Sequence, residues 1–344
     1  MLSDKLFPYK WYLKGGYPAK GIEKHGLTAF GTFICGGGSS MGYKLAGYNH
    51  LGGVEIDTKM SELYQKNHNP KYLFTEDIRA FNKRDDLPEE LYNLDLLDGS
   101  PPCSSFSLAG VRERDWGKQK KFAEGQALQT LDDLVFVYCD AILKLRPKVA
   151  ILENVKGLIQ GNAKPYANKI IAKLEAGGYD VQLFLLDASL LGVPQKRERV
   201  FFIARRKDLS LPPLKIEYLN KRITWREVLD CVPKEGDIAP AFSDLYIGYK
   251  MMATKTVGKF SSGYGVQKLH LPASTVVAGG AQPLPHPYKS RPISKNENIL
   301  IQSFPLDYDF GTFKKYWYVL GMSVPPVMMA NLSYQIYKQL LSKS

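Results

Sequence analysis

The stretch Leu131–Leu152 reads LDDLVFVYCDAILKLRPKVAIL, and its hydrophobic period changes in the middle. The apolar side chains before the change recur at helical spacing, at Leu134, Tyr138, Ala141, Ile142 and Leu145, which predicts a helix from about Leu131 to Leu145. Val149–Leu152 is wholly apolar and predicts a strand that is buried on both faces. A helix followed so closely by a buried strand is typical of a βαβ unit.

The same alternation extends in both directions from this stretch. Further strands are predicted at Leu27–Ile34, Leu51–Ile56, Leu94–Asp98, Val181–Leu186 and Val200–Ala204. Further helices are predicted at Ser39–Ala46, from an Asp57 cap to Asn67, and at Ala167–Ala176. Repeated alternation predicts an α/β fold with a doubly wound, mostly parallel, Rossmann-like sheet and a second, smaller unit.

Four segments are expected. Residues 1–25 look like an irregular N-terminal extension, and residues 26–207 form the alternating domain. Residues 208–290 are rich in Pro, Gly and Ser and have no clear helical period beyond Trp225–Leu229. Residues 291–344, with a helical pattern in Pro326–Leu341, are expected to return to the first domain.

Composition limits the function classes. The 46 Lys and Arg exceed the 34 Asp and Glu, for a net charge of +12, which favours a polyanionic partner over a merely solvated basic surface. No run of 18 apolar residues and no signal-like N-terminus occur, so a soluble, intracellular protein without a membrane span is expected. The four cysteines are spread singly, which argues against a zinc site or a disulfide framework.

The segment Phe33–Gly42 carries three consecutive glycines, Gly36–Gly38, between a predicted strand and helix. Glycines there allow a nucleotide-like cofactor to approach the backbone and the helix N-terminus, although many such turns are only tight connections. Glu55, at the end of the next strand, is placed to accept hydrogen bonds from ribose hydroxyls. Asp77 could receive an adenine amino group, or it could simply cap a helix.

Three further places carry reactive or charged groups. Cys103 follows Pro101-Pro102 directly after a strand, where stiff prolines would present a nucleophile or merely build a tight turn. Glu153 stands at the carboxyl end of a buried strand, the edge at which open α/β sheets bind ligands. Arg197 and Arg199 precede another strand and should project from one face, where they could hold a phosphate or a carbonyl oxygen.

The order and spacing of these segments resemble the DNA (cytosine-5)-methyltransferase family from about Leu27 to Leu341. The glycine-rich segment resembles the family's first motif, Glu55 the second, Asp77 the third and Pro101-Pro102-Cys103 the fourth. Glu153-Asn154-Val155 resembles the sixth and Gln195–Arg199 the eighth, and segments from Arg291 to Pro305 and Gly321 to Pro326 resemble the ninth and tenth.

The resemblance implies methyl transfer from S-adenosylmethionine to C5 of a cytosine flipped out of duplex DNA. It implies that Cys103 adds to C6, that Glu153 binds the N3 and N4 edge, and that an arginine binds O2, with Arg199 favoured over Arg197. It implies a cofactor pocket of Phe33, Gly36, Gly37, Gly38, Glu55, Ile56, Asp77, Ile78, Pro102, Leu134, Ser323 and Val324. It also implies DNA contacts by Ser104, Ser105, Lys118, Lys120, Lys121, Gln195, Lys250, Lys255 and Lys259.

By the same resemblance, residues 104–124 would be a mobile loop and residues 208–290 a target-recognition domain, and the likeness is interrupted mainly between Asp208 and His270. A monomer in the cytoplasm, encoded by a prokaryote or a phage, is expected. Several positions depart from the family pattern: Gly31, Cys35, Ser104, Met322 and the absence of an arginine in Gln129–Leu134. None of them removes a group that makes or breaks bonds, so activity is expected to survive.

Three other functions stay open on the sequence alone. A tRNA cytosine-5 methyltransferase would have the same fold and a similar charge. A non-catalytic DNA-binding relative would fit the altered first and tenth motifs. A nicotinamide-dependent oxidoreductase would fit the glycine-rich turn and Glu55, but it leaves Cys103, Glu153 and the arginines unexplained.

Overall fold

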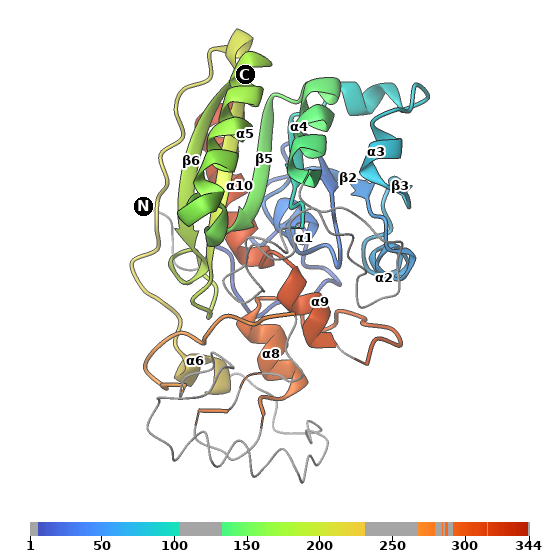
Figure 1. Ribbon diagram of the computed structural model, residues 1–344. Helices are drawn as coiled ribbons and strands as arrows, with labels where there is room; N and C mark the ends of the chain where they lie inside the picture. The colour runs from blue at the N-terminus through green and yellow to red at the C-terminus, as the bar shows by residue number, and fades with distance from the viewer. Residues whose placement is uncertain are drawn as a thin grey trace.

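The computed structural model describes residues 6–102, 133–230, 267–278, 284, 286–287, 292–314 and 316–342. Within these residues, the strands form one sheet in the order β3-β2-β1-β4-β5-β7-β6 (Figure 1). Strands β1 to β5 run parallel, whereas β7 is antiparallel to both β5 and β6. The bounds are β1 Thr28–Thr32, β2 Asn49–Val54, β3 Tyr72–Phe74, β4 Leu96–Gly99, β5 Val149–Val155, β6 Tyr179–Asp187 and β7 Glu198–Arg206.

Helices connect these strands, and the last α-helix of the described chain packs against the sheet again. The α-helices are α1 Gly38–Leu45, α2 Thr58–His68, α3 Ile78–Phe81, α4 Leu134–Leu145, α5 Lys164–Ala176, α6 Trp225–Asp230, α8 Lys295–Ile301, α9 Tyr316–Met322 and α10 Pro326–Ile336. Short 3-10 turns lie at Glu89–Tyr92, Lys156–Ile159, Gly161–Ala163, Ala188–Leu190 and Lys207–Leu209, and a π turn at Tyr337–Leu341 extends α10.

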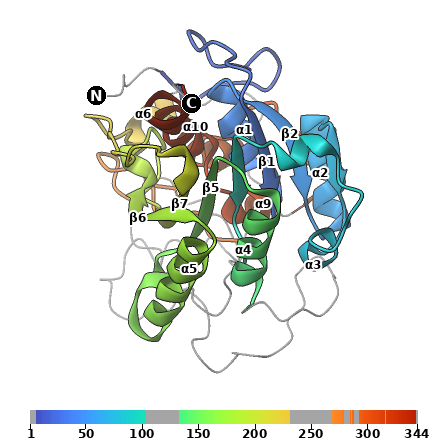
Figure 2. The same cartoon turned by 90° about the horizontal axis from the view of Figure 1, so that it is seen from above.

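Alternating side chains of the central strands divide between two hydrophobic cores. Val149 and Ile151 of β5 belong to the core that α1 and α10 cover, whereas Ala150 and Leu152 belong to the core beneath α4 and α5. Figure 2 shows these two pairs of helices on opposite sides of the sheet. A strand buried on both faces reads as a continuous apolar run, which explains the sequence Val149–Leu152.

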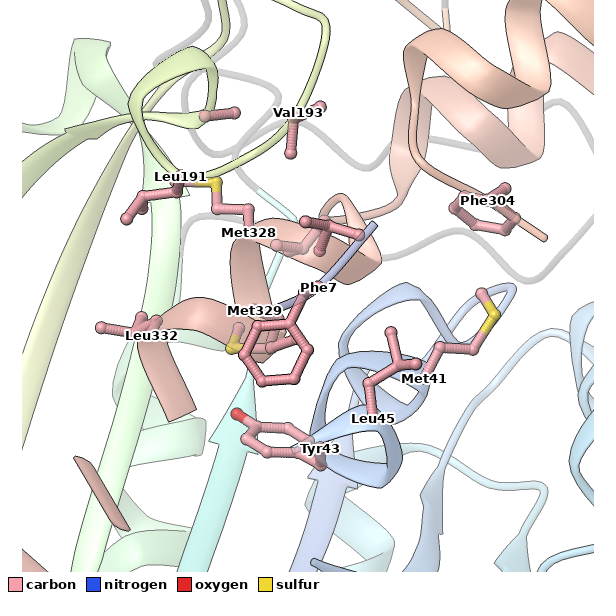
Figure 3. Close-up of a cluster of buried hydrophobic side chains, with 14 of the residues drawn as sticks. Phe7, Met41, Tyr43, Leu45, Leu191, Val193, Phe304, Met328, Met329 and Leu332 are labelled. Atoms are coloured by element: carbon pink, nitrogen blue, oxygen red, sulfur yellow. The ribbon is translucent and has the colours of Figure 1, made fainter. Parts of the chain in front are cut away.

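The C-terminal helix packs directly on the first helix. A side chain at Gly42 of α1 would lie 2.6 Å from Met329 Cβ and 2.7 Å from the Pro326 carbonyl oxygen of α10. Figure 3 shows Met41, Tyr43 and Leu45 of α1 in one cluster with Met328, Met329 and Leu332 of α10. Helix α10 therefore lies against α1, and the return of residues 291–344 as a segment to the first domain stays a prediction.

The predicted α/β architecture with a mostly parallel sheet is confirmed. Helix α2 begins after Asp57, whose carboxylate accepts from the backbone N–H groups of Lys59 and Met60, as expected for a cap. The predicted strand and helix boundaries differ from the observed ones by one to three residues at one or both ends, as β5 and α4 illustrate. Strand β5 continues through Val155 because antiparallel β7 extends the ladder, and α4 begins at Leu134. The N-terminal segment has no helix or strand within residues 6–25, yet its Phe7 and Trp11 are buried in the core. The predicted boundaries at residues 208 and 291 stay predictions.

Candidate active site

The predicted site residues converge on one edge of the sheet. Phe33 follows β1, Glu55 follows β2 and Asp77 follows β3, while Pro101 follows β4 and Glu153 lies near the end of β5. Because these strands are parallel, their carboxyl ends meet at this edge, where ligands bind in open α/β sheets. Antiparallel β7 begins at the same edge, so Arg199 lies opposite Val155.

The glycine-rich turn is tightly enclosed by protein. Phe33 and Cys35 have left-handed φ angles of 55° and 46°, and Gly37 has a φ of 78° at the N-terminus of α1. A Cβ at Gly37 would lie 2.1 Å from His68 Nε2, and one at Gly38 would lie 2.1 Å from the Val324 carbonyl oxygen. We expected these glycines to make room for a ligand. The structure adds a different reason, because protein groups fill the space a side chain would need.

Glu55 joins this turn to the start of α2. Its Oε2 accepts from the Cys35 N–H and its Oε1 from the Asp57 N–H, each at 2.9 Å. Burial raises the pKa of Glu55 to about 7, although these hydrogen bonds favour the charged form. Each carboxylate oxygen has a further lone pair, so Glu55 can still accept from ribose hydroxyls. Its neighbour Ile56 is half-buried.

Asp77 takes the role that the sequence left as an alternative, because it caps α3. Its carboxylate accepts from the Arg79 N–H at 2.8 Å and pairs with the Arg79 guanidinium at 3.2 Å. Arg79 also pairs with Asp133, directly before Leu134, at 2.6 Å. The predicted cofactor residues Ile78 and Leu134 are both buried beside these groups. The ion pairs thus bring the ends of β3 and the start of α4 together, and Asp77 remains about one-third exposed.

The Pro-Pro turn is anchored by a residue that the sequence reasoning did not assign. Asn154 of β5 donates its side-chain amide to the Pro101 carbonyl oxygen at 3.2 Å. Pro102 is half-buried. The expected nucleophile, Cys103, lies outside the described residues, as do the expected DNA contacts Ser104, Ser105, Lys118, Lys120, Lys121, Lys250, Lys255 and Lys259.

Glu153 and Arg199 form a buried ion pair at the end of β5. Arg199 Nε lies 3.2 Å from Glu153 Oε1, and their side chains are 16% and 10% exposed. Burial lowers the pKa of Arg199, and the Glu153 carboxylate opposes that shift. The pair offers an acceptor and a donor side by side in a sheltered place, as recognition of a polar ring edge requires.

Arg197 does not lie parallel to Arg199, and this corrects our expectation for the pair. Its guanidinium is buried and donates to the carbonyl oxygens of Val276 and Gly321 at 2.9 Å and of Ser323 at 3.2 Å. Arg197 precedes the first residue of β7, so the strand period of two does not govern it. Its N–H groups therefore hold the segment before α10 instead of reaching a substrate.

Gln195 is also part of the interior. Its side-chain amide donates to the Gln302 side-chain oxygen and accepts from the Val276 N–H at 2.9 Å. Gln302 in turn donates to the Ser323 carbonyl oxygen at 2.9 Å. Because Gln195 has no exposed surface, we replace the expected DNA contact by a structural role. The network holds Ser323 and Val324 against the glycine-rich turn.

A second unassigned residue is Asp98, the third residue of β4. It is 4% exposed, and burial raises the pKa of its carboxyl group to about 7. An acidic residue near the end of an apolar strand is the sequence pattern that could have identified Asp98. The same pattern identified Glu153 as a candidate. Within the described ranges, no group of three His, Cys, Asp or Glu side chains could hold a metal ion. No helix in that part of the chain is long and apolar enough for a bilayer crossing.

Comparisons with known proteins point to one family. The chain matches the family described as C-5 cytosine-specific DNA methylase over residues 29–235. It is 30% identical over 286 residues to the Type II methyltransferase M.FnuDI of Fusobacterium nucleatum. The matched region covers 79% of this chain and 77% of that relative. It is 28% identical over 346 residues to the Type II methyltransferase M.Sau96I of Staphylococcus aureus. The matched region covers 91% of this chain and 75% of that relative.

Solved structures share the fold. One is a candidate DNA modification methyltransferase encoded within an E. coli prophage, with a TM-score of 0.68 and 21% identity, covering 91% of this chain and 99% of that chain. Another is a variant of Spodoptera frugiperda DNMT2, with a TM-score of 0.61 and 18% identity, covering 91% and 100%.

Proposed function

Because the chain belongs to the C-5 cytosine-specific DNA methylase family, it is a DNA (cytosine-5)-methyltransferase, and we propose that it acts through a covalent bond between Cys103 and the target cytosine. The substrate we propose is duplex DNA, as the net charge of +12 favours a polyanion. A base inside the duplex is out of reach, so the cytosine must be flipped into the edge formed by β4, β5 and β7.

The Glu153–Arg199 pair is the observation that carries this proposal. The ring nitrogen N3 and the exocyclic oxygen O2 of cytosine are both bonded to C2 and lie on one edge of the base, and the pair presents an acceptor and a donor 3.2 Å apart. Arg199 would donate to O2, while Glu153 would accept from the N4 amino group and from N3 once N3 is protonated. These contacts strengthen as the ring accepts electrons, so they stabilise the adduct more than the free base.

The cysteine chemistry follows from the weak nucleophilicity of C5. The Cys103 thiolate adds to C6, and the electron pair displaced to C5 forms a bond to the donor's methyl carbon as the S–CH3 bond breaks. The C5 proton then passes to solvent, and the Cys103–C6 bond breaks to restore the thiolate. Asn154 would hold the Pro101 carbonyl and thereby the direction in which the following turn presents its sulfur.

For the methyl donor we propose S-adenosylmethionine, which supplies a methyl group activated by a sulfonium. Glu55 would accept from the ribose hydroxyls and Asp77 from the adenine amino group, after partial release from Arg79. Ile78 and Leu134 would line the adenine side, and Ser323 and Val324 close the pocket behind the glycine-rich turn. The remaining expected contacts, Phe33, Ile56 and Pro102, lie on the same edge.

The test combines a trap with a substrate comparison. Duplex DNA that contains 5-fluorocytosine cannot lose a C5 proton, so the enzyme should remain bonded to it after methyl transfer. We expect an adduct with the parent and with Cys231→Ser, and none with Cys103→Ser. Tight binding without an adduct would indicate a non-catalytic DNA-binding protein. Transfer of labelled methyl groups to tRNA but not to duplex DNA would overturn the choice of DNA.

A further inference from the structure

Asp98 occupies the middle of the active-site edge without an assigned role. In the register of the sheet it lies between Gly31 of β1 and Ile151 of β5. Its neighbour two positions earlier, Leu96, belongs to the core beneath α1, so Asp98 projects to the α1 side of the sheet. It is 4% exposed, which is close to the 9% of Glu55 and the 8% of Glu153.

The Asp98 carboxyl group is buried without a cationic partner in the part of the chain that the structure describes. No Lys, Arg or His of the described residues forms an ion pair with it, and its Oδ1 has no hydrogen bond of good geometry. Ser39 and Tyr43 of α1 lie close enough to favour its charged form, but the Tyr43 hydroxyl is also left without a satisfactory partner. A buried acid that lacks a cation is costly, so it calls for a positively charged ligand or for a proton.

The order of acidic groups across the sheet indicates which ligand that is. Glu55 follows β2, Asp98 lies one residue before the end of β4 and Glu153 two residues before the end of β5, with the glycine-rich turn after β1 between the first two. With the donor's ribose at Glu55 and the cytosine at Glu153, the donor must extend from β2 toward β4 for its methyl group to reach C5. Its methionine part carries an ammonium group, which needs an anionic partner near β1 and β4.

We propose that Asp98 binds the ammonium group of the methionine part of S-adenosylmethionine. The inference rests on the proposed function, because it takes the donor's orientation from Glu55 and Glu153. Asp98 is thus a cofactor-binding residue that connects the donor to the strand leading into Pro101-Pro102-Cys103. The competing explanation is structural: a permanently protonated Asp98 could only tie β4 to α1 through Ser39 and Tyr43.

The two explanations differ in which part of the ligand they concern. Calorimetric binding to the full chain should therefore compare S-adenosylmethionine with 5′-methylthioadenosine, which keeps the adenosine but lacks the methionine part. We expect Asp98→Asn to weaken S-adenosylmethionine about 10- to 100-fold, as for loss of a charge-assisted hydrogen bond, and to leave 5′-methylthioadenosine unchanged. Glu55→Gln should weaken both ligands, and Tyr43→Phe should weaken neither by more than about twofold.

Unchanged S-adenosylmethionine affinity in Asp98→Asn, or equal loss for both ligands, would overturn the proposal. A parent protein that binds neither ligand would contradict the proposed function instead. If Asp98→Asn does not fold, S-adenosylhomocysteine and its analogue without the amino group are compared on the parent. We expect the analogue to bind at least about tenfold more weakly, and equal affinity would overturn the proposal.

Discussion

Asn154 donates its side-chain amide to the carbonyl oxygen of Pro101, across 3.2 Å, and so joins β5 to the turn that precedes Cys103. The same residue uses its side-chain oxygen to accept from the Val155 N–H at 2.7 Å. Asn154 is therefore held in place while it holds the turn. Its neighbour Glu153 lies in the same strand, so in the proposed mechanism one rigid element would support both the group that recognises the base and the turn that presents the sulfur.

From this contact we expect Asn154→Ala to lower kcat for DNA methylation about 10- to 100-fold with little change in cofactor affinity, because small misplacements of a nucleophile are costly. Asn331→Ala is the matched control, since Asn331 is equally buried and donates to the Leu191 carbonyl oxygen at 2.9 Å away from the site. Both variants should lose similar stability in thermal unfolding. Equal kcat values for the two variants would show that the Pro101 contact has no catalytic role.

Substitutions of Arg197, which precedes β7, and of Arg199, which lies in β7, should have different effects on stability and activity. Arg197→Ala removes the donor to the Val276 and Gly321 carbonyl oxygens and one of the two donors to the Ser323 carbonyl oxygen, so we expect a loss of about 3 kcal/mol or more in the free energy of unfolding. Arg199→Ala also costs stability, because it leaves the buried Glu153 carboxylate without its partner, but in the folded protein it should lower kcat about 10²- to 10³-fold through loss of the O2 contact. Urea denaturation and single-turnover methylation measure the two effects. A larger loss of kcat in Arg197→Ala than in Arg199→Ala would assign the O2 contact to Arg197 instead.

The buried acids should make stability depend on pH in a stated direction. The pKa of Asp98 is raised from 3.8 to about 7, so between these values the unfolded chain loses this proton before the folded chain does. The folded state then binds more protons, and the Asp98 contribution to stability falls as the pH rises through that window. Glu55, whose pKa is also raised to about 7, acts in the same direction.

Buried histidines act in the opposite direction, because the pKa of His68 is lowered to about 3 and that of His50 is also lowered. The measurement must therefore be a difference between proteins. We expect Asp98→Asn to gain stability relative to the parent from pH 4 to pH 7, on the order of a few kcal/mol in total. Urea unfolding at four pH values gives this difference. A constant difference would mean that the Asp98 proton is not linked to folding.

The glycine-rich turn allows a matched pair of substitutions. Gly37 and Gly161 both have positive φ angles, but only Gly37 would place its new methyl group against another residue, 2.1 Å from His68 Nε2. Gly161→Ala should cost only the strain of the left-handed backbone, about 1 kcal/mol. Gly37→Ala should cost clearly more and abolish cofactor binding. In a His68→Ala background the extra cost of Gly37→Ala should shrink, and an unchanged cost would exclude the predicted clash.

Local sequence patterns predicted most of the fold, because they report which side chains are buried. The alternation around Leu131–Leu152 led to α4 and β5, and Asp57 marked the start of α2. The antiparallel direction of β7 was not readable, since a strand buried on both faces has the same apolar run in either direction. Phe7 and Trp11 escaped notice for a related reason: they enter the core from a segment without a period.

The position of a candidate site residue was predictable where the residue lies close to its own strand end. Glu55, Asp77 and Glu153 fall at the expected edge. Arg197 and Gln195 were assigned to substrates because their partners, Val276, Gln302, Gly321 and Ser323, lie far along the chain. The sequence around a charged or amide side chain does not indicate whether that side chain bonds to a backbone carbonyl group or to a ligand. Asn154 belongs to the motif Glu153-Asn154-Val155, but its hydrogen bond to Pro101 depends on the register of β4 and β5.

The enclosure of the glycine-rich turn has a consequence for biosynthesis. The Gly36 carbonyl oxygen accepts from the Tyr308 hydroxyl at 2.7 Å, and Gly38 rests against Val324. Both partners are translated nearly three hundred residues after the turn itself. A nascent chain cannot close the walls of this turn before residues 308–324 have been made. Under the proposed function, donor binding would therefore require the chain through α9 and the start of α10, and a product truncated before Tyr308 would not bind the donor.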